Sequence, residues 1–168
     1  MIKNILFFLV VFTCLLADTH AQLPRIAFRA DVAAVQTSPS SPLHFDAIKY
    51  NEGSSYSTSG NAFVAPTNGL YFFSLSLLWN GYGCGAVGGS IKVAAVRNSG
   101  DTLQYLGKLS PYRDRGNFST AFSFSTKLSA GDRVRIGVVN TLCDLHSGGS
   151  LPVLYSGSFS GYRVYADQ

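Results

Sequence analysis

The chain has 168 residues, of which 46% are hydrophobic and 13% are charged, and 13 basic against 9 acidic residues give a formal charge of +4. This composition excludes a disordered tail, a collagen, a coiled coil and a multi-domain enzyme. It also argues against nucleic-acid binding, because the pI near 9.1 comes from a scarcity of acidic residues and the sequence has no run of Lys and Arg.

Residues 1–21 have the pattern of a secretory signal peptide. Lys3 precedes an apolar run over Ile5–Leu16, and small residues follow at Thr19 and Ala21. A membrane anchor is the alternative, but a bilayer core needs about 20 apolar residues and this run is too short. We therefore expect a leader over 1–21 and a single secreted, extracellular domain over 22–168, without membrane insertion.

Two cysteines, Cys84 and Cys143, remain once a leader that contains Cys14 is removed. An even pair in an oxidising compartment predicts a disulfide bond between them. Two buried thiols are the alternative.

The rest of the chain is predicted to form strands, because apolar residues recur with a period of two and no stretch longer than two turns has helical periodicity. In chain order the expected strands are Ile26–Val32, Leu43–Tyr50, Gly60–Val64, Gly69–Trp79, Gly89–Asn98, Thr102–Leu109, Phe118–Leu128, Arg133–Asn140 and Ser158–Tyr165. Proline-rich Thr37–Pro42 is a loop, and Asn98–Asp101 and Ser129–Asp132 are expected hairpin turns. This many short strands predict a two-sheet sandwich or barrel, with a jelly roll as the natural candidate.

The expected strand Phe118–Leu128 shows how the alternation assigns its two faces. Phe118, Phe122 and Phe124 share one face, and the small residues between them share the other. We expect the phenylalanines to point into the core and the small face to meet water or a close neighbour.

Aromatic, asparagine and glycine residues recur at fixed spacing in two segments. They are Phe45, Asn51, Tyr56, Phe63, Gly69, Tyr71 and Phe73 in the first and Phe159, Gly161 and Tyr162 in the second. This pattern resembles the globular head domain of complement C1q over about residues 26–166. Leu75 departs from it where the family has an aromatic residue, and Arg163 where the family usually has an apolar one. We expect the set to form a core motif that specifies the fold and not a binding site, since aromatic side chains dominate core packing.

The resemblance implies an all-β, ten-strand antiparallel jelly-roll sandwich of the C1q and tumour-necrosis-factor type that assembles as a homotrimer. It also implies a non-enzymatic, lectin-like protein of innate immunity that binds microbial surface glycans or other extracellular ligands. A structural protein of an extracellular or mineralised matrix and a cytokine-like receptor ligand are the alternatives. Some relatives of this kind bind calcium, but the calcium ligands do not map onto identifiable residues here. The sequence therefore predicts neither the presence nor the absence of a calcium site.

Successive connections in a jelly roll mostly alternate between its two ends, so the loops 81–89, 110–116 and 143–152 are expected at one end. This arrangement would bring Cys84 near Cys143, as a disulfide bond requires. Seven aromatic, charged or histidine side chains in these loops are candidate ligand-binding residues: Tyr82, Tyr112, Arg113, Asp114, Arg115, Asp144 and His146. An ordinary solvated loop with an internal Arg–Asp pair is the alternative.

The sequence has no motif that predicts catalysis. It contains no HExxH motif and no clustered Cys and His residues, and its GxGxxG match at 83–88 opens a strand where a nucleotide site needs a helix N-terminus. The sequon Asn117-Phe118-Ser119 predicts an N-linked glycan at Asn117.

Overall fold

The computed structural model describes residues 25–37, 42–80, 89–98, 101–109, 117–143 and 153–167. The strands over these residues are β1 (Ala27–Asp31), β2 (Ala47–Glu52), β3 (Tyr56–Ser57), β4 (Ala62–Val64), β5 (Gly69–Asn80), β6 (Gly89–Arg97), β7 (Asp101–Leu109), β8 (Asn117–Leu128), β9 (Arg133–Cys143) and β10 (Val153–Ala166). None of the described residues is helical. These described residues accordingly include no helix long and apolar enough to cross a bilayer.

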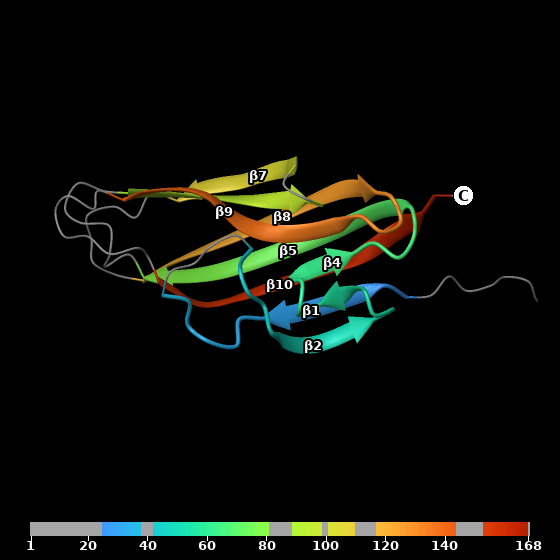
Figure 1. The fold of residues 1–168 in the computed structure, drawn as a ribbon, viewed down its shortest axis with the longest axis horizontal. Helices are drawn as coiled ribbons and strands as arrows, with labels where there is room; N and C mark the ends of the chain where they lie inside the picture. The colour runs from blue at the N-terminus through green and yellow to red at the C-terminus, as the bar shows by residue number, and fades with distance from the viewer. Residues whose placement is uncertain are drawn as a thin grey trace, which may run out of the picture.

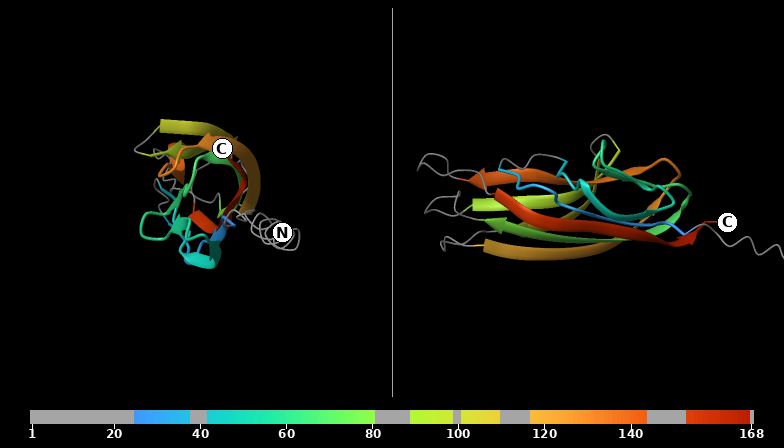
Figure 2. Two further views of the ribbon diagram at one scale, coloured as in Figure 1. Left: turned by 90° about the vertical axis from the view of Figure 1, so that its right-hand side faces the viewer. Right: turned by 90° about the horizontal axis from the view of Figure 1, so that it is seen from below.

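The strands form two five-stranded antiparallel sheets packed face to face (Figure 1). Sheet A has the order β2-β1-β10-β5-β8, and sheet B has the order β3-β4-β9-β6-β7. Strands from the two ends of the chain are neighbours, since Ala27 of β1 lies opposite Tyr162 of β10. The end view in Figure 2 shows the strands curving around a common interior. The expected all-β antiparallel jelly-roll sandwich is therefore confirmed.

Aromatic rings from both sheets fill this interior. The Phe28 ring lies 4.9 Å from the Tyr56 ring, 5.4 Å from the Phe63 ring and 5.0 Å from the Phe159 ring. On β5 every second side chain is fully buried, and this row ends at Trp79. Leu75, which departs from the family pattern, belongs to the same row and is also fully buried. Leucine therefore fills the core at the position where the family has an aromatic residue.

The faces expected for β8 are confirmed. Phe124 is buried, and Phe118 and Phe122 are partly buried against the same core. Ser119 and Ser123, on the opposite face, are exposed. The alternation of large and small residues thus sets the orientation of the strand.

Two expected strand starts were wrong, and one strand was missed. The segment Leu43–Asp46 is not paired as a strand, because Leu43 donates its backbone N–H to Ile136 of β9 and its side chain enters the core. The short strand β3 was not expected, and β10 begins five residues before the expected Ser158.

The expected hairpin at Ser129–Asp132 was also wrong. This turn joins β8 of sheet A to β9 of sheet B, so the two strands that it connects do not pair. Gly131 has a φ of +86° there, a conformation that glycine adopts without strain. The expected hairpin between β6 and β7 is confirmed, since Arg97 lies opposite Asp101.

Candidate functional site

The strand ends that flank the three long loops lie together at one end of the sandwich. In sheet A, Asn80 is opposite both Asn117 and Val153, and in sheet B Gly89 is opposite Cys143. Figure 1 shows these ends at the left of the sandwich. The register thus confirms that the strands leading into and out of these loops end at the same pole.

The candidate ligand-binding residues Tyr82, Tyr112, Arg113, Asp114, Arg115, Asp144 and His146 lie outside the described residues. Cys84 lies outside them too, and Cys143 is described by its backbone alone, opposite Gly89. The ligand residues and the disulfide bond therefore stay predictions.

The glycosylation candidate Asn117 is exposed at the first position of β8. Its Oδ1 accepts a hydrogen bond from Nδ2 of Asn80 at 3.1 Å, which holds the side chain at the edge of sheet A. The position is accessible to solvent, and occupancy by a glycan stays a prediction.

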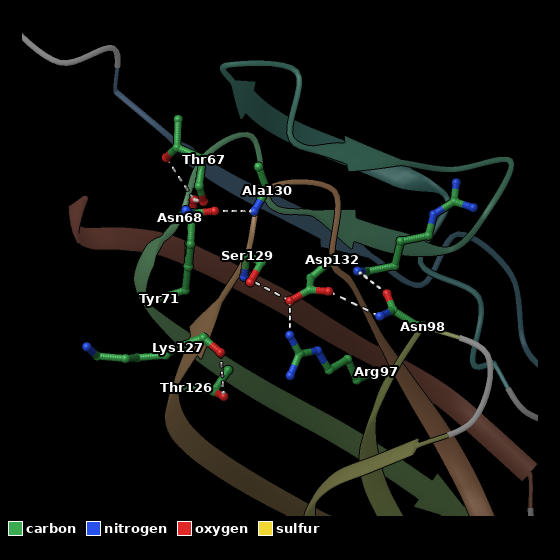
Figure 3. A network of polar contacts seen from close by, with 11 residues as sticks. Thr67, Asn68, Tyr71, Arg97, Asn98, Thr126, Lys127, Ser129, Ala130 and Asp132 are labelled. Atoms are coloured by element: carbon green, nitrogen blue, oxygen red, sulfur yellow. Dashed lines mark hydrogen bonds and ion pairs between the residues drawn. The ribbon is translucent and has the colours of Figure 1, made fainter. Parts of the chain in front are cut away.

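A buried carboxylate, Asp132, joins two turns at the opposite end of the sandwich (Figure 3). It accepts hydrogen bonds from the Arg97 guanidinium, from Nδ2 of Asn98 at 3.1 Å and from the backbone N–H of Ser129 at 2.8 Å. The Asn98 Oδ1 in turn accepts from the backbone N–H of Arg133 at 3.0 Å. These hydrogen bonds occupy the carboxylate oxygens of Asp132. The cluster is therefore structural, and it links the end of β6 to the β8–β9 turn.

These contacts lower the pKa of Asp132 from its ordinary value of 3.8. Burial alone would raise the pKa, but the hydrogen bonds from Arg97, Ser129 and Asn98 and the Arg97 charge outweigh it. The unfolded chain therefore takes up a proton at a higher pH than the folded chain does. The stabilisation is complete above the ordinary pKa and is lost as the pH falls through the lower folded value.

We expect Asp132→Ala to lower the free energy of unfolding by about 2–4 kcal/mol at neutral pH, because it leaves the Arg97 guanidinium without its acceptor. Asp31→Ala is the matched control, since Asp31 pairs with the more exposed Arg29 and Lys49 and its loss should cost under about 1 kcal/mol. Urea denaturation measures both variants. Equal losses in the two variants would contradict a special role for Asp132.

Asp132→Asn tests the pH dependence separately. Between about pH 6 and pH 2 the wild type should lose more stability than this variant, because only the wild type protonates a carboxylate at this position. Parallel stability curves for the two proteins would show that the pKa of Asp132 does not differ between the folded and unfolded chains.

The outer face of sheet A carries exposed aromatic side chains near the end of β10. Tyr50, Tyr162 and Tyr165 are 46–49% exposed, and the Phe72 ring lies 5.3 Å from that of Tyr162. We call these four residues the aromatic face. Large exposed apolar groups gathered in this way are typical of a protein–protein contact.

A metal site is not evident in the described part of the chain, which contains no group of three or more His, Cys, Asp or Glu residues suited to a metal ion. The loop carboxylates Asp114 and Asp144 lie outside it. The residues described thus provide no set of calcium ligands.

The family model of the C1q domain matches residues 27–162, which is most of the chain. The chain belongs to the C1q domain family. No curated protein sequence matches it.

Solved structures with the same fold include the globular domain of zebrafish complement 1qA protein, with a TM-score of 0.54 and 16% identity over 85% of this chain and 99% of that one. Eiger TNF from S. frugiperda has a TM-score of 0.58 and 14% identity over 86% of this chain and 96% of that one. At these identities the likeness shows a shared fold. C1q and tumour-necrosis-factor-like domains are typically extracellular, non-enzymatic binding modules, and membership supports a recognition or ligand protein.

The structure gives a physical reason for the C1q pattern in this chain. The Asn51 side chain donates to the Tyr56 carbonyl at 2.8 Å and accepts from the Tyr56 N–H at 2.9 Å, which closes the turn between β2 and β3. Phe45, Phe63 and Phe159 are buried in the core. The residues of the pattern therefore form one turn and one cluster of buried aromatic rings.

The two glycines of the pattern allow close contacts between strands. A Cβ atom on Gly69 would lie 2.2 Å from the Tyr165 carbonyl oxygen, and one on Gly161 would lie 2.5 Å from the Phe73 ring. Tyr162 does not fit the expectation of a core residue, because it is 49% exposed on the aromatic face. Alternation along β10 points it away from the core, since its neighbour Gly161 faces inward.

Proposed function

We propose that the chain is a secreted homotrimer that recognises microbial surface glycans through the loops at 81–88, 110–116 and 144–152. The observation that carries the proposal is that the strands bordering these loops end at one pole of the sandwich. Binding residues are commonly found on loops held by a rigid scaffold. The loop sequences supply arginine, tyrosine and acidic side chains suited to hydroxyl-rich ligands.

The aromatic face supports the homotrimer. A monomer would leave three tyrosines about half exposed on one sheet, next to Val164, which is 49% exposed. Burial of apolar surface in a symmetric assembly is favourable, and C1q and tumour-necrosis-factor-like domains typically form trimers. Three loop ends in one particle would raise the avidity of weak individual contacts for a repetitive glycan surface.

Size-exclusion chromatography with light scattering tests the assembly. The mature chain, residues 22–168, should be a trimer at about 10 µM, and Tyr162→Asp should shift it toward monomer, because a carboxylate buried without a partner is costly. Gln104→Asp adds the same charge at an exposed position of β7 and should remain trimeric. A monomeric wild type, or dissociation of both variants, would contradict the proposed interface.

Glycan-array and whole-bacteria binding test the recognition function. The wild type should bind a defined set of microbial glycans, and Arg113→Ala combined with Arg115→Ala should weaken binding by about tenfold or more, since bidentate guanidinium contacts are lost. Arg133→Gln with Arg135→Gln removes the same charge from sheet B and is the control. Binding to host cells alone, or to a mineral matrix alone, would replace this proposal with a receptor ligand or a structural protein.

A further inference from the structure

We propose that a β-bulge at Val164, held by the side chain of Arg163, positions the aromatic face for contact with a second copy of this chain. The proposal rests on the homotrimer of the proposed function. It assigns a role to Arg163, where this chain departs from the C1q pattern. Arg163 is a positioning residue, because it acts on the contact surface through the path of β10.

The bulge lies near the end of β10, where this strand pairs with β5. Arg163 is opposite Tyr71 and Tyr165 is opposite Leu70, so Val164 is an extra residue that faces no residue of β5. A β-bulge of this kind re-aims the side chains that follow it. Because a shift of one residue moves side chains to the other face of a sheet, the residues after the bulge take the opposite alternation to those before it.

This change of alternation turns Tyr165 outward. Tyr162 is opposite Phe72 on the outer face of sheet A, and regular alternation from Tyr162 would direct Tyr165 into the core. With the bulge, Tyr165 is opposite Leu70, which is on the same face of β5 as Phe72. Tyr162 is accordingly 49% exposed, Val164 49% and Tyr165 46%. The bulge thus places both tyrosines of β10 on the aromatic face.

The close approach at Gly69 is a second sign that the bulge is built into the strand pairing. Gly69 begins β5 opposite Ala166, and a Cβ atom at residue 69 would lie 2.2 Å from the Tyr165 carbonyl oxygen. A side chain there would displace the backbone directly after the bulge. Glycine at this position therefore lets β10 keep its path past the extra residue.

The Arg163 side chain anchors β10 just before the bulge. Its Nη1 donates to Oγ1 of Thr67 at 3.0 Å, and its backbone N–H donates to the Ile26 carbonyl at 3.0 Å. Thr67 is itself held by Tyr71, whose hydroxyl donates to the Thr67 carbonyl at 2.7 Å (Figure 3). Since Tyr71 is fully buried, these contacts connect Arg163 to the core.

The chain is also held just after the bulge, and by the same turn. The backbone N–H of Asp167 donates to the Asn68 carbonyl at 3.1 Å, and the Asp167 carboxylate lies 3.9 Å from Nζ of Lys127. This ion pair is exposed and adds little by itself. Thr67 and Asn68 therefore contact β10 and its end on the two sides of Val164.

Arginine holds this position differently from an apolar residue. An apolar side chain would be retained by burial, which is non-directional, whereas the guanidinium of Arg163 makes a directional hydrogen bond to the Thr67 turn. A surface that is already fixed in its bound geometry loses less conformational entropy on association. Weakening the anchor should therefore affect assembly more than the stability of the subunit.

Light scattering over a range of concentrations tests the proposal on residues 22–168. Arg163→Met keeps a long side chain and removes the guanidinium, and it should raise the concentration at which half of the trimer dissociates by about tenfold. Thr67→Val removes the acceptor hydroxyl and should act in the same direction. Arg163→Lys keeps a donor and should recover most of the assembly. Arg133→Met is the matched control on β9 of the other sheet and should stay within about twofold of the wild type.

Amide hydrogen exchange separates the anchor from the assembly. In the background of Tyr162→Asp, which is expected to be monomeric, Arg163→Met should speed exchange over residues 163–167 by about tenfold, because the strand end loses its anchor. Exchange over β5 and the urea midpoint of this background should change little. A variant that lost β5 protection as well would act through general destabilisation, which would contradict a positioning role.

Two results would overturn the proposal and leave the homotrimer standing. One is a trimeric wild type whose assembly is unchanged in both Arg163→Met and Thr67→Val, and the other is equal weakening by Arg133→Met. Unchanged exchange over residues 163–167 would reject the anchor whatever the state of assembly. A monomeric wild type would reject the homotrimer and with it the second copy as partner, and faster exchange in Arg163→Met would then support the anchored bulge alone.

Discussion

Gly69→Ala is expected to lower the free energy of unfolding by about 3 kcal/mol or more. The new Cβ would lie 2.2 Å from the carbonyl oxygen of Tyr165 and 3.1 Å from the Cα of Ala166. Both are backbone atoms of β10, so a side-chain rotation cannot relieve the overlap and the pairing of β5 with β10 must shift. Overpacking that moves backbone costs at least as much as the larger measured core insertions. Chemical denaturation of residues 22–168 measures the loss.

Gly60→Ala is the matched control for this prediction. A Cβ at residue 60 would meet its nearest atoms at 3.5 Å and 3.6 Å, which is ordinary van der Waals contact. The change should therefore stay within about 0.5 kcal/mol of the wild type. If the two variants were equally stable, the close approach of β5 and β10 at Gly69 would be wrong.

Phe73→Ala is expected to lower the free energy of unfolding by about 3–5 kcal/mol. Phe73 is fully buried, and its ring lies 5.1 Å from those of Phe63 and Phe124 and 5.8 Å from that of Phe159. Its removal would leave a cavity between the two sheets, because these neighbours come from three different strands and cannot all close onto it.

Phe72→Ala provides the comparison, since the same residue type is removed one position earlier on β5. Phe72 points to the outer face of sheet A, where it contacts Tyr162. Its loss should cost the subunit much less stability than that of Phe73, and it should instead weaken the proposed trimer, as measured by light scattering. A larger loss of subunit stability from Phe72→Ala would mean that the faces of β5 are assigned the wrong way round.

The fold class was predicted correctly from the sequence, because alternation with a period of two indicates which side chains of a strand share a face. On this basis Tyr71, Phe73 and Phe124 were expected inside, and all three are buried. The spacing from Asn51 to Tyr56 likewise has a local origin, since both ends of the motif belong to one turn. Local patterns of this kind can be recognised in the sequence before the pairing of the strands is known.

Features that depend on pairing were harder to predict. The Ser129–Asp132 turn has the composition of a hairpin, yet it crosses between sheets because Asp132 binds Arg97 and Asn98, which precede it by more than 30 residues. The segment Leu43–Asp46 has a strand-like pattern, but the core takes up its apolar side chains without sheet pairing. For the loop end, the register confirmed where the strands lead, and the binding residues themselves stay predictions.

The sequence by itself determined an all-β sandwich with an aromatic core, because the alternation of its side chains and the C1q spacing are properties of short segments. The tertiary structure alone decided that Tyr162 faces outward beside Phe72 and that Asp132 meets Arg97 and Asn98. These side chains become neighbours through the pairing of strands far apart in the chain, and a linear pattern does not encode that pairing.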